Sequence, residues 1–182
     1  SSTNPRTELG VGGDGEVRLY LNNSGSSWDL FKTSALLRDT GWYHLVYVFD
    51  STQSTSSDRV SLYVNGVKQT ALSTNTYPSQ NHDSYINNTS AHYIGSSPLP
   101  SAYYDGSISQ VYLIDGQALD ASYFGFTDPL TNTWRPKKYE GDYGVGPASG
   151  LNGVIWSDYI TGTVDGTYPL SNCFGGNIGS GY

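Results

Sequence analysis

The sequence is poor in cysteine, methionine and charged residues. Its 182 residues contain one cysteine, Cys173, and no methionine, and 14% of them are charged. One cysteine excludes an internal disulfide, so the fold cannot depend on the cross-links that many small secreted domains use. The length suffices for one sandwich domain, or for one domain and a fragment.

Basic residues and long apolar runs are also scarce. Nine Lys and Arg residues stand against sixteen Asp and Glu, which gives a formal net charge of −7. A nucleic-acid-binding domain needs a basic face, and the pair Lys137 and Lys138 is too small to supply one. No apolar run reaches the roughly 18 residues of a spanning helix. We therefore expect neither nucleic acid as a partner nor a membrane span.

The residues that are abundant favour strands. The 22 Gly and 16 Tyr residues, together with low charge, are typical of short strands joined by tight turns. The chain is organised around Gly41–Thr70. Within it, Trp42–Phe49 is apolar on both faces, which predicts a central strand in a sheet covered on both sides. Asn65 and Gly66 tolerate positive φ and predict a type I′ hairpin turn after a strand over Arg59–Val64.

The flanking segments give further expectations from hydrophobic alternation and from turn residues. These are a polar, Gly-rich segment over Ser1–Gly15 with a loop at Gly12–Gly15, strands over Glu16–Leu21, Trp28–Lys32, His92–Gly95 and Asp105–Ile114, a long loop over Ser73–Ser90, and one helical turn capped by Asp120.

Several motifs occur in a specific order. They are WYHLVYVFD at 42–50, RVSLYVNGVKQ at 59–69, HYIGSS at 92–97 and YYDGSISQVYLIDGQAL at 103–119. Together they resemble the concanavalin A-like, laminin-G-like family over Glu16–Phe124. The resemblance implies an all-β fold, an antiparallel β-sandwich of the concanavalin A-like jelly-roll type.

The later motifs are similar to laminin-G-type modules of bacteriophage virion proteins. They are Ile114–Leu119, Phe124 with Gly125, Trp134–Pro136 and Tyr139–Gly144. This resemblance implies a location in the virion, at the phage particle surface or tail fibre, with other virion protein chains as partners. A location outside the cell or at the cell surface is the alternative.

The composition changes after Tyr143. The predicted organisation is a jelly roll over residues 1–143, a Gly-, Pro- and Ser-rich linker over residues 144–153, and the beginning of a second β module or an extended tail over residues 154–182. Compared with the family, an opening aromatic strand and a closing apolar strand are not recognised. A missing edge strand would leave unpaired backbone groups for a neighbouring chain, so a homo-oligomer is expected.

Catalytic and metal-binding patterns are weak. Glycosidases of the superfamily carry a Glu-x-Asp-x-x-Glu strand, whereas Glu occurs here at positions 8, 16 and 140 without a carboxylate at that spacing. The chain is therefore expected not to be an enzyme. The resemblance implies Ca²⁺ as the one cofactor to consider, since Asp50, Asp58, Asp83 and Asp105 lie on or beside loops. No calcium-loop motif is present and ordinary turn roles explain these residues equally well, so no metal ligand is named.

Carbohydrate binding is the function that this architecture implies. Sugars stack their C–H faces on aromatic rings and bond their hydroxyls to amides and carboxylates. The candidate residues with that chemistry are Trp28, Tyr77, Asp83, Tyr85, Asn87, Tyr103 and Asp105. Each of them is alternatively a core or turn residue, and Tyr104 occupies the family's core aromatic position.

Three functional hypotheses follow. The first is a non-catalytic lectin-like module of a phage tail fibre that binds glycan or polysaccharide on the host surface. The second is a structural spacer or assembly module of a virion or fibre, without a ligand. The third is a bacterial surface adhesion module.

Overall fold

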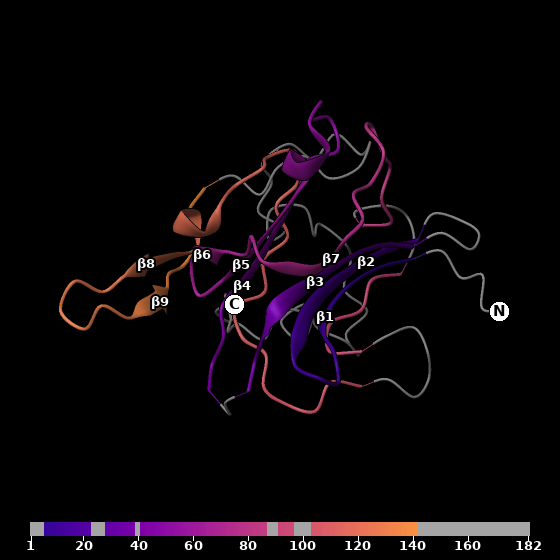
Figure 1. Ribbon diagram of the computed structural model, residues 1–182. Coiled ribbons are helices and arrows are strands. Elements are labelled where there is room, and N and C mark those ends of the chain that lie inside the picture. The colour runs from indigo at the N-terminus through magenta and orange to yellow at the C-terminus, as the bar shows by residue number, and fades with distance from the viewer. Residues whose placement is uncertain (1–5, 23–27, 39–40, 87–90, 97–102, 142–182) are drawn as a thin grey trace, which may run out of the picture.

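The computed structural model describes residues 6–22, 28–38, 41–86, 91–96 and 103–141, and these form antiparallel sheets joined by loops (Figure 1). The strands are β1 (Arg6–Val11), β2 (Glu16–Asn22), β3 (Trp28–Leu36), β4 (Leu45–Phe49), β5 (Val60–Val64), β6 (Val67–Lys68), β7 (Leu72–Asn75), β8 (Gly125–Thr127) and β9 (Trp134–Pro136). Two 3₁₀ turns, η1 (Ser56–Asp58) and η2 (Ala121–Tyr123), complete the described elements. No described helix is long and apolar enough to cross a membrane.

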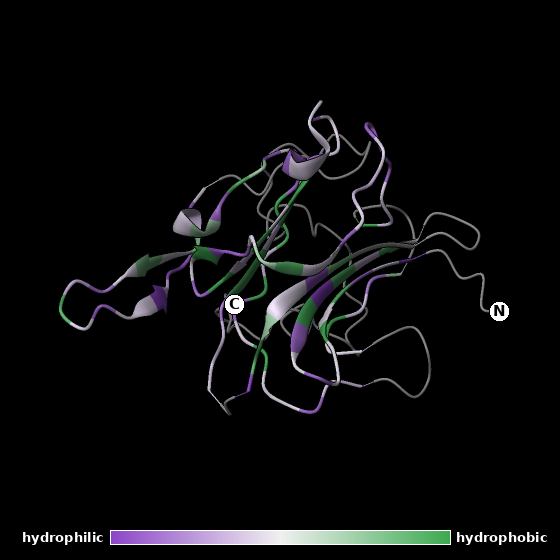
Figure 2. Ribbon diagram, in the orientation of Figure 1, coloured by the Kyte–Doolittle hydropathy of each residue, from purple (hydrophilic) through white to green (hydrophobic). Residues whose placement is uncertain are grey.

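The larger sheet has the strand order β1-β2-β3-β7. On β2, the predicted alternation is confirmed because Val17, Leu19 and Leu21 are buried on one face. The hydropathy colours alternate along these strands in the same way (Figure 2). β1 lies within the polar segment Ser1–Gly15, where no strand was expected. It also pairs with β2 along its whole length and so supplies a strand before the first one expected.

The smaller sheet has the order β4-β5-β6. The predicted hairpin turn is confirmed, because Asn65 has φ 48° and Gly66 has φ 79°. Asn65 also accepts a hydrogen bond from the backbone N–H of His44 through its side-chain Oδ1 at 2.8 Å. Its own N–H donates to the carbonyl oxygen of His44 at 2.8 Å. This reciprocal pair ties the turn to the residue just before β4.

Both faces of the smaller sheet are covered. One face packs against the larger sheet in a core that includes Phe31 and Val60, with Tyr47 and Phe49 against it. The other face carries Val46, which clusters with the buried Phe124 and Tyr139 from the C-terminal part of the described chain. Coverage of both faces was predicted for β4. Its central position was not found, since β4 ends the order β4-β5-β6 of the described sheet.

The C-terminal part of the described chain begins with η2. Its predicted cap is confirmed, since the Asp120 side chain accepts from the N–H of Ser122 at 2.8 Å. The β8–β9 hairpin follows and extends away from the two sheets (Figure 1). The Trp134 ring lies against the backbone of Gly66 and Gly125, where a Cβ atom would come within 2.3 and 2.4 Å of ring carbons.

Two expected strands are not formed. Residues 92–95 and 105–114 have no ladder in the described chain, and the one link beside them is an isolated bridge between Ser96 and Tyr103. The expected long loop over Ser73–Ser90 begins later, because β7 includes its first residues. The predicted linker (144–153) and the second module or tail (154–182) lie outside the described residues.

Candidate functional site

The first sugar-binding candidate in the loop after β7 is Tyr77, and its ring points toward the core. The Tyr77 ring packs edge-on against Phe31, with 5.0 Å between ring centroids, and borders the main core. Tyr77 is therefore partly buried against the core, a position that does not favour its predicted role in sugar stacking. The cause is a contact far apart in sequence, between the end of the loop and β3.

Other candidates from this loop are separated from one another. Asp83 is exposed, and Tyr85 is half-buried, with its N–H bonded to Thr7 Oγ1 at 3.2 Å. Trp28 begins β3, where its backbone pairs with Asn22 at the end of β2. Asn87 lies outside the described residues. The described part of this loop thus offers no exposed aromatic platform.

The candidates around Tyr103 form an exposed aromatic surface. Tyr103 pairs with Ser96, and the Tyr104 N–H donates to the carbonyl oxygen of Gly95 at 2.8 Å, which sets two segments side by side. We call the exposed tyrosines of these segments the tyrosine surface. Its members and their exposed fractions are Tyr93 (54%), Tyr103 (74%) and Tyr104 (53%). Asp105 is exposed beside them.

Gly106 leaves room for the ring of Tyr104 in the tyrosine surface. The Tyr104 ring lies against Gly106, where a Cβ atom would approach the ring carbons and hydroxyl to 2.7–2.9 Å. The ring therefore covers backbone instead of entering a core. The expectation from the resemblance that Tyr104 is a core aromatic is wrong in this structure, because the residue remains about half exposed.

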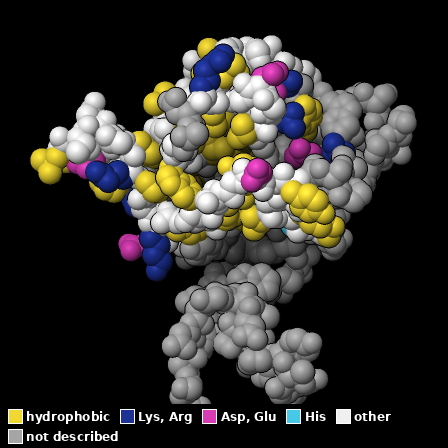
Figure 3. All heavy atoms as spheres, turned by 90° about the horizontal axis from the view of Figure 1, so that it is seen from below, with side chains coloured by type: hydrophobic (Ala, Val, Ile, Leu, Met, Phe, Trp, Pro, Cys, Tyr) yellow, Lys and Arg dark blue, Asp and Glu magenta, His cyan; other side chains and the backbone are white. Residues whose placement is uncertain are grey.

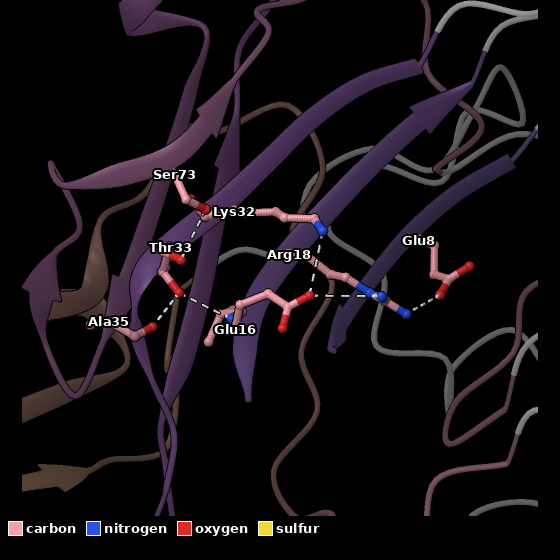
Figure 4. A network of polar contacts seen from close by, with 8 residues as sticks. Glu8, Glu16, Arg18, Lys32, Thr33, Ala35 and Ser73 are labelled. Carbon is pink, nitrogen blue, oxygen red and sulfur yellow. Dashed lines mark hydrogen bonds and ion pairs between the residues drawn. The ribbon is translucent and has the colours of Figure 1, made fainter. Parts of the chain in front are cut away.

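A charged network on the outer face of the larger sheet was not anticipated from the sequence (Figure 4). Arg18 lies between two carboxylates, 3.8 Å from Glu8 and 4.0 Å from Glu16, and Lys32 approaches Glu16 to 3.6 Å. The Arg18 guanidinium also stacks over the Tyr20 ring at 5.0 Å. The alternation of Glu16, Arg18 and Tyr20 opposite the buried face is the signal that could have revealed it.

This network does not provide an acid catalyst. A glycosidase needs one carboxyl group that stays protonated near neutral pH, and this requires a raised pKa. A hydrogen bond from its own backbone N–H, reinforced by Lys32 and Arg18, lowers the pKa of Glu16. Glu16 is therefore an ionised partner in ion pairs, and it does not have the chemistry of a proton donor.

The carboxylates do not form a metal-binding group. In the described chain, no three His, Cys, Asp or Glu residues lie together in a way that could hold a metal ion. Asp50, one of the loop aspartates, uses Oδ1 to accept from Thr52 and Oδ2 to accept from Gln53 at 2.6 Å. These hydrogen bonds lower the pKa of Asp50. The described acidic side chains thus do not form a cluster of the kind that holds a metal ion.

Comparison with protein families identifies the fold family. The model of a laminin G family, described as the concanavalin A-like lectin/glucanases superfamily, matches residues 1–122. The chain belongs to this family. The match, with the antiparallel sheets, confirms the predicted concanavalin A-like β-sandwich.

One solved structure is also similar at low identity. It is the 2.1 Å crystal structure of an S-layer domain-containing protein (residues 221–444) from Clostridium thermocellum ATCC 27405. The TM-score is 0.33 and the identity 22%, over 66% of this chain and 55% of that one, so this chain spans about half of its length. No curated protein sequence matches the chain significantly.

Proposed function

We propose that this laminin-G-like chain is a non-catalytic carbohydrate-binding module and that its tyrosine surface contacts the glycan. The observation that carries the proposal is the exposure of Tyr93, Tyr103 and Tyr104 on two adjoining segments. Exposed aromatic rings offer faces for the apolar C–H sides of a sugar. The Asp105 carboxylate beside them can accept hydrogen bonds from sugar hydroxyls.

The biological setting of the proposal is a virion appendage such as a phage tail fibre. The sequence similarity of Ile114–Leu119, Phe124 with Gly125, and Trp134–Pro136 to modules of virion proteins supports this setting. The ligand would then be a glycan on the host surface. A module with this role needs no catalytic pair, which agrees with the ion-paired state of Glu16.

A glycan array with the purified chain tests the proposal. We expect binding by the wild type and at least tenfold weaker binding by a Tyr103→Ala/Tyr104→Ala variant, since tenfold corresponds to about 1.4 kcal/mol. Tyr123→Ala is the matched control, because Tyr123 is also about half exposed but belongs to η2. Absence of glycan binding by folded wild type, or equal losses in both variants, would contradict the proposal.

A second candidate function is assembly with other copies or other virion chains. Aliphatic side chains are also exposed on the segments that carry the tyrosine surface or follow it in sequence, namely those of Ile94, Ile108, Val111 and Leu113. Figure 3 shows hydrophobic side chains reaching the surface at several places on one face. Exposed apolar groups favour protein contacts more than sugar contacts. Sedimentation equilibrium tests this candidate. An assembly surface is expected to give an apparent mass that rises with protein concentration. The Val111→Ser/Leu113→Ser variant should then have a lower apparent mass than the wild type.

A further inference from the structure

Two loops of the sandwich meet at the side chain of Arg59. One loop follows β4 and the other follows β7. The Nε and Nη2 atoms of Arg59 donate to the carbonyl oxygens of Gln53 and Ser54 at 2.8 and 2.9 Å in the first loop. The Nη1 atom donates to the carbonyl oxygen of Pro78 at 2.7 Å in the second loop. All three guanidinium nitrogens thus bond to main-chain oxygens, and they join segments that are distant in sequence.

Further hydrogen bonds connect the same two loops. The N–H of Asn81 donates to the Ser51 carbonyl oxygen at 2.8 Å, and Ser51 Oγ donates to the His82 carbonyl oxygen at 2.8 Å. The Gln80 side-chain amide donates to the Thr52 carbonyl oxygen at 2.9 Å. The two loops therefore form one hydrogen-bonded layer, which we call the Arg59 loop layer.

Converging carbonyl oxygens beside an aspartate are the kind of donor set that Ca²⁺ prefers. Here the three carbonyl oxygens already bind a positively charged group. The nearby carboxylate of Asp50 accepts from Thr52 and Gln53 within its own loop and makes no ion pair in the described structure. A guanidinium group supplies positive charge and several fixed donor directions in one side chain.

We propose that Arg59 takes the structural place of a cation in the Arg59 loop layer. The two loops then keep their conformation without Ca²⁺, the one cofactor that the family resemblance brought into consideration. This inference concerns the fold and holds whether or not the tyrosine surface binds glycan.

The first test measures thermal unfolding of the wild-type chain by circular dichroism. The chain is stripped with EDTA and compared with the same sample in millimolar Ca²⁺. We expect the same Tm in both conditions, and titration calorimetry with Ca²⁺ alone is expected to show no saturable heat. A Tm that rises by several degrees with Ca²⁺, or a stoichiometric binding heat, would overturn the proposal.

The second test replaces Arg59. Arg59→Gln removes the charge and two of the three donor directions, and we expect its Tm to fall by several degrees. Arg38→Gln is the matched control, because it makes the same change of charge at an exposed arginine. Equal Tm values for the two variants would show that the carbonyl contacts contribute nothing and would overturn the proposal.

Arg59→Lys keeps the test decisive if Arg59→Gln does not fold. Lysine retains the charge but lacks the planar guanidinium group with its several donor directions. We therefore expect a Tm between those of the wild type and Arg59→Gln. Hydrogen exchange should be faster at the amide of Asn81, which bonds across the two loops, than in the wild type. Amides of β2 should exchange at a rate explained by the global change alone. If the Asn81 amide showed no acceleration beyond that global change, Arg59 would not be the group that holds the layer.

Discussion

The indole N–H of Trp134 donates a hydrogen bond to Nδ1 of His44 at 3.0 Å. This contact joins the β8–β9 hairpin to the chain just before β4, across 90 positions of sequence. The two rings are also close, with centroids 5.9 Å apart. Because Nδ1 accepts, the imidazole is neutral and carries its proton on Nε2. The hairpin is therefore anchored by a histidine whose imidazole must stay neutral, with no proton on Nδ1.

This anchor predicts a loss of stability in mild acid. Burial lowers the pKa of His44. A histidine with a lowered folded-state pKa contributes its full stabilisation above its unfolded pKa of about 6.5, and loses it as the pH falls through the folded value. We expect Tm to decrease between about pH 7.5 and about pH 5. His44→Gln, measured over the same range, should lose less, whereas an equal loss would assign the effect to other groups.

The close packing of Trp134 predicts that Gly125→Ala is destabilising. The added Cβ would meet the indole ring at 2.4 Å, so the ring or the hairpin must shift. Overpacking of this kind typically costs about 1–3 kcal/mol. Gly13→Ala is the control, since nothing lies within 4 Å of its Cβ position. Urea unfolding of both variants measures the difference, and equal midpoints would show that the hairpin adapts freely.

We expect the loss of the Thr33 hydroxyl group to lower the free energy of unfolding. It is buried on β3, where Oγ1 accepts from the N–H of Val17 at 3.1 Å and donates to the Ala35 carbonyl oxygen at 2.6 Å. Thr33→Val keeps the shape but leaves the buried Val17 N–H without this acceptor. We expect a loss of about 1–3 kcal/mol in the free energy of unfolding. Thr33→Ser, which keeps the hydroxyl, should lose less; the opposite order would show that the methyl group matters more.

Strands with a clear two-residue alternation could be predicted from the sequence. β2 buries Val17, Leu19 and Leu21 as expected, and the turn at Asn65 follows from backbone preferences alone. β1 was not predicted because it contains polar residues whose ion-pair partners lie on another strand. Its Glu8 lies 3.8 Å from Arg18 of β2, and no local pattern reports such a pairing.

The candidate site shows the same division. Aromatic content selected both Tyr103, whose side chain is exposed, and Tyr77, whose side chain packs against the core. The two segments differ in the groups that their tyrosine rings contact in the folded chain. Tyr77 meets Phe31 of β3, whereas Tyr104 meets the bare backbone of Gly106. Composition cannot distinguish these outcomes, since both are long-range packing results.

Tyr47 predicts a substitution that does not weaken the fold. Its ring packs in the core between the sheets, and its hydroxyl oxygen is buried without a hydrogen-bond partner among the described residues. Burial also raises the pKa of Tyr47, because the low-polarity surroundings oppose the phenolate. A buried polar group without a partner is destabilising, so Tyr47→Phe should be neutral or stabilise the protein by about 1 kcal/mol. Tyr47→Leu removes the ring as well and should be clearly destabilising. Urea unfolding of the three proteins gives the order, and a marked loss in Tyr47→Phe would mean that the hydroxyl has a bonding partner in solution.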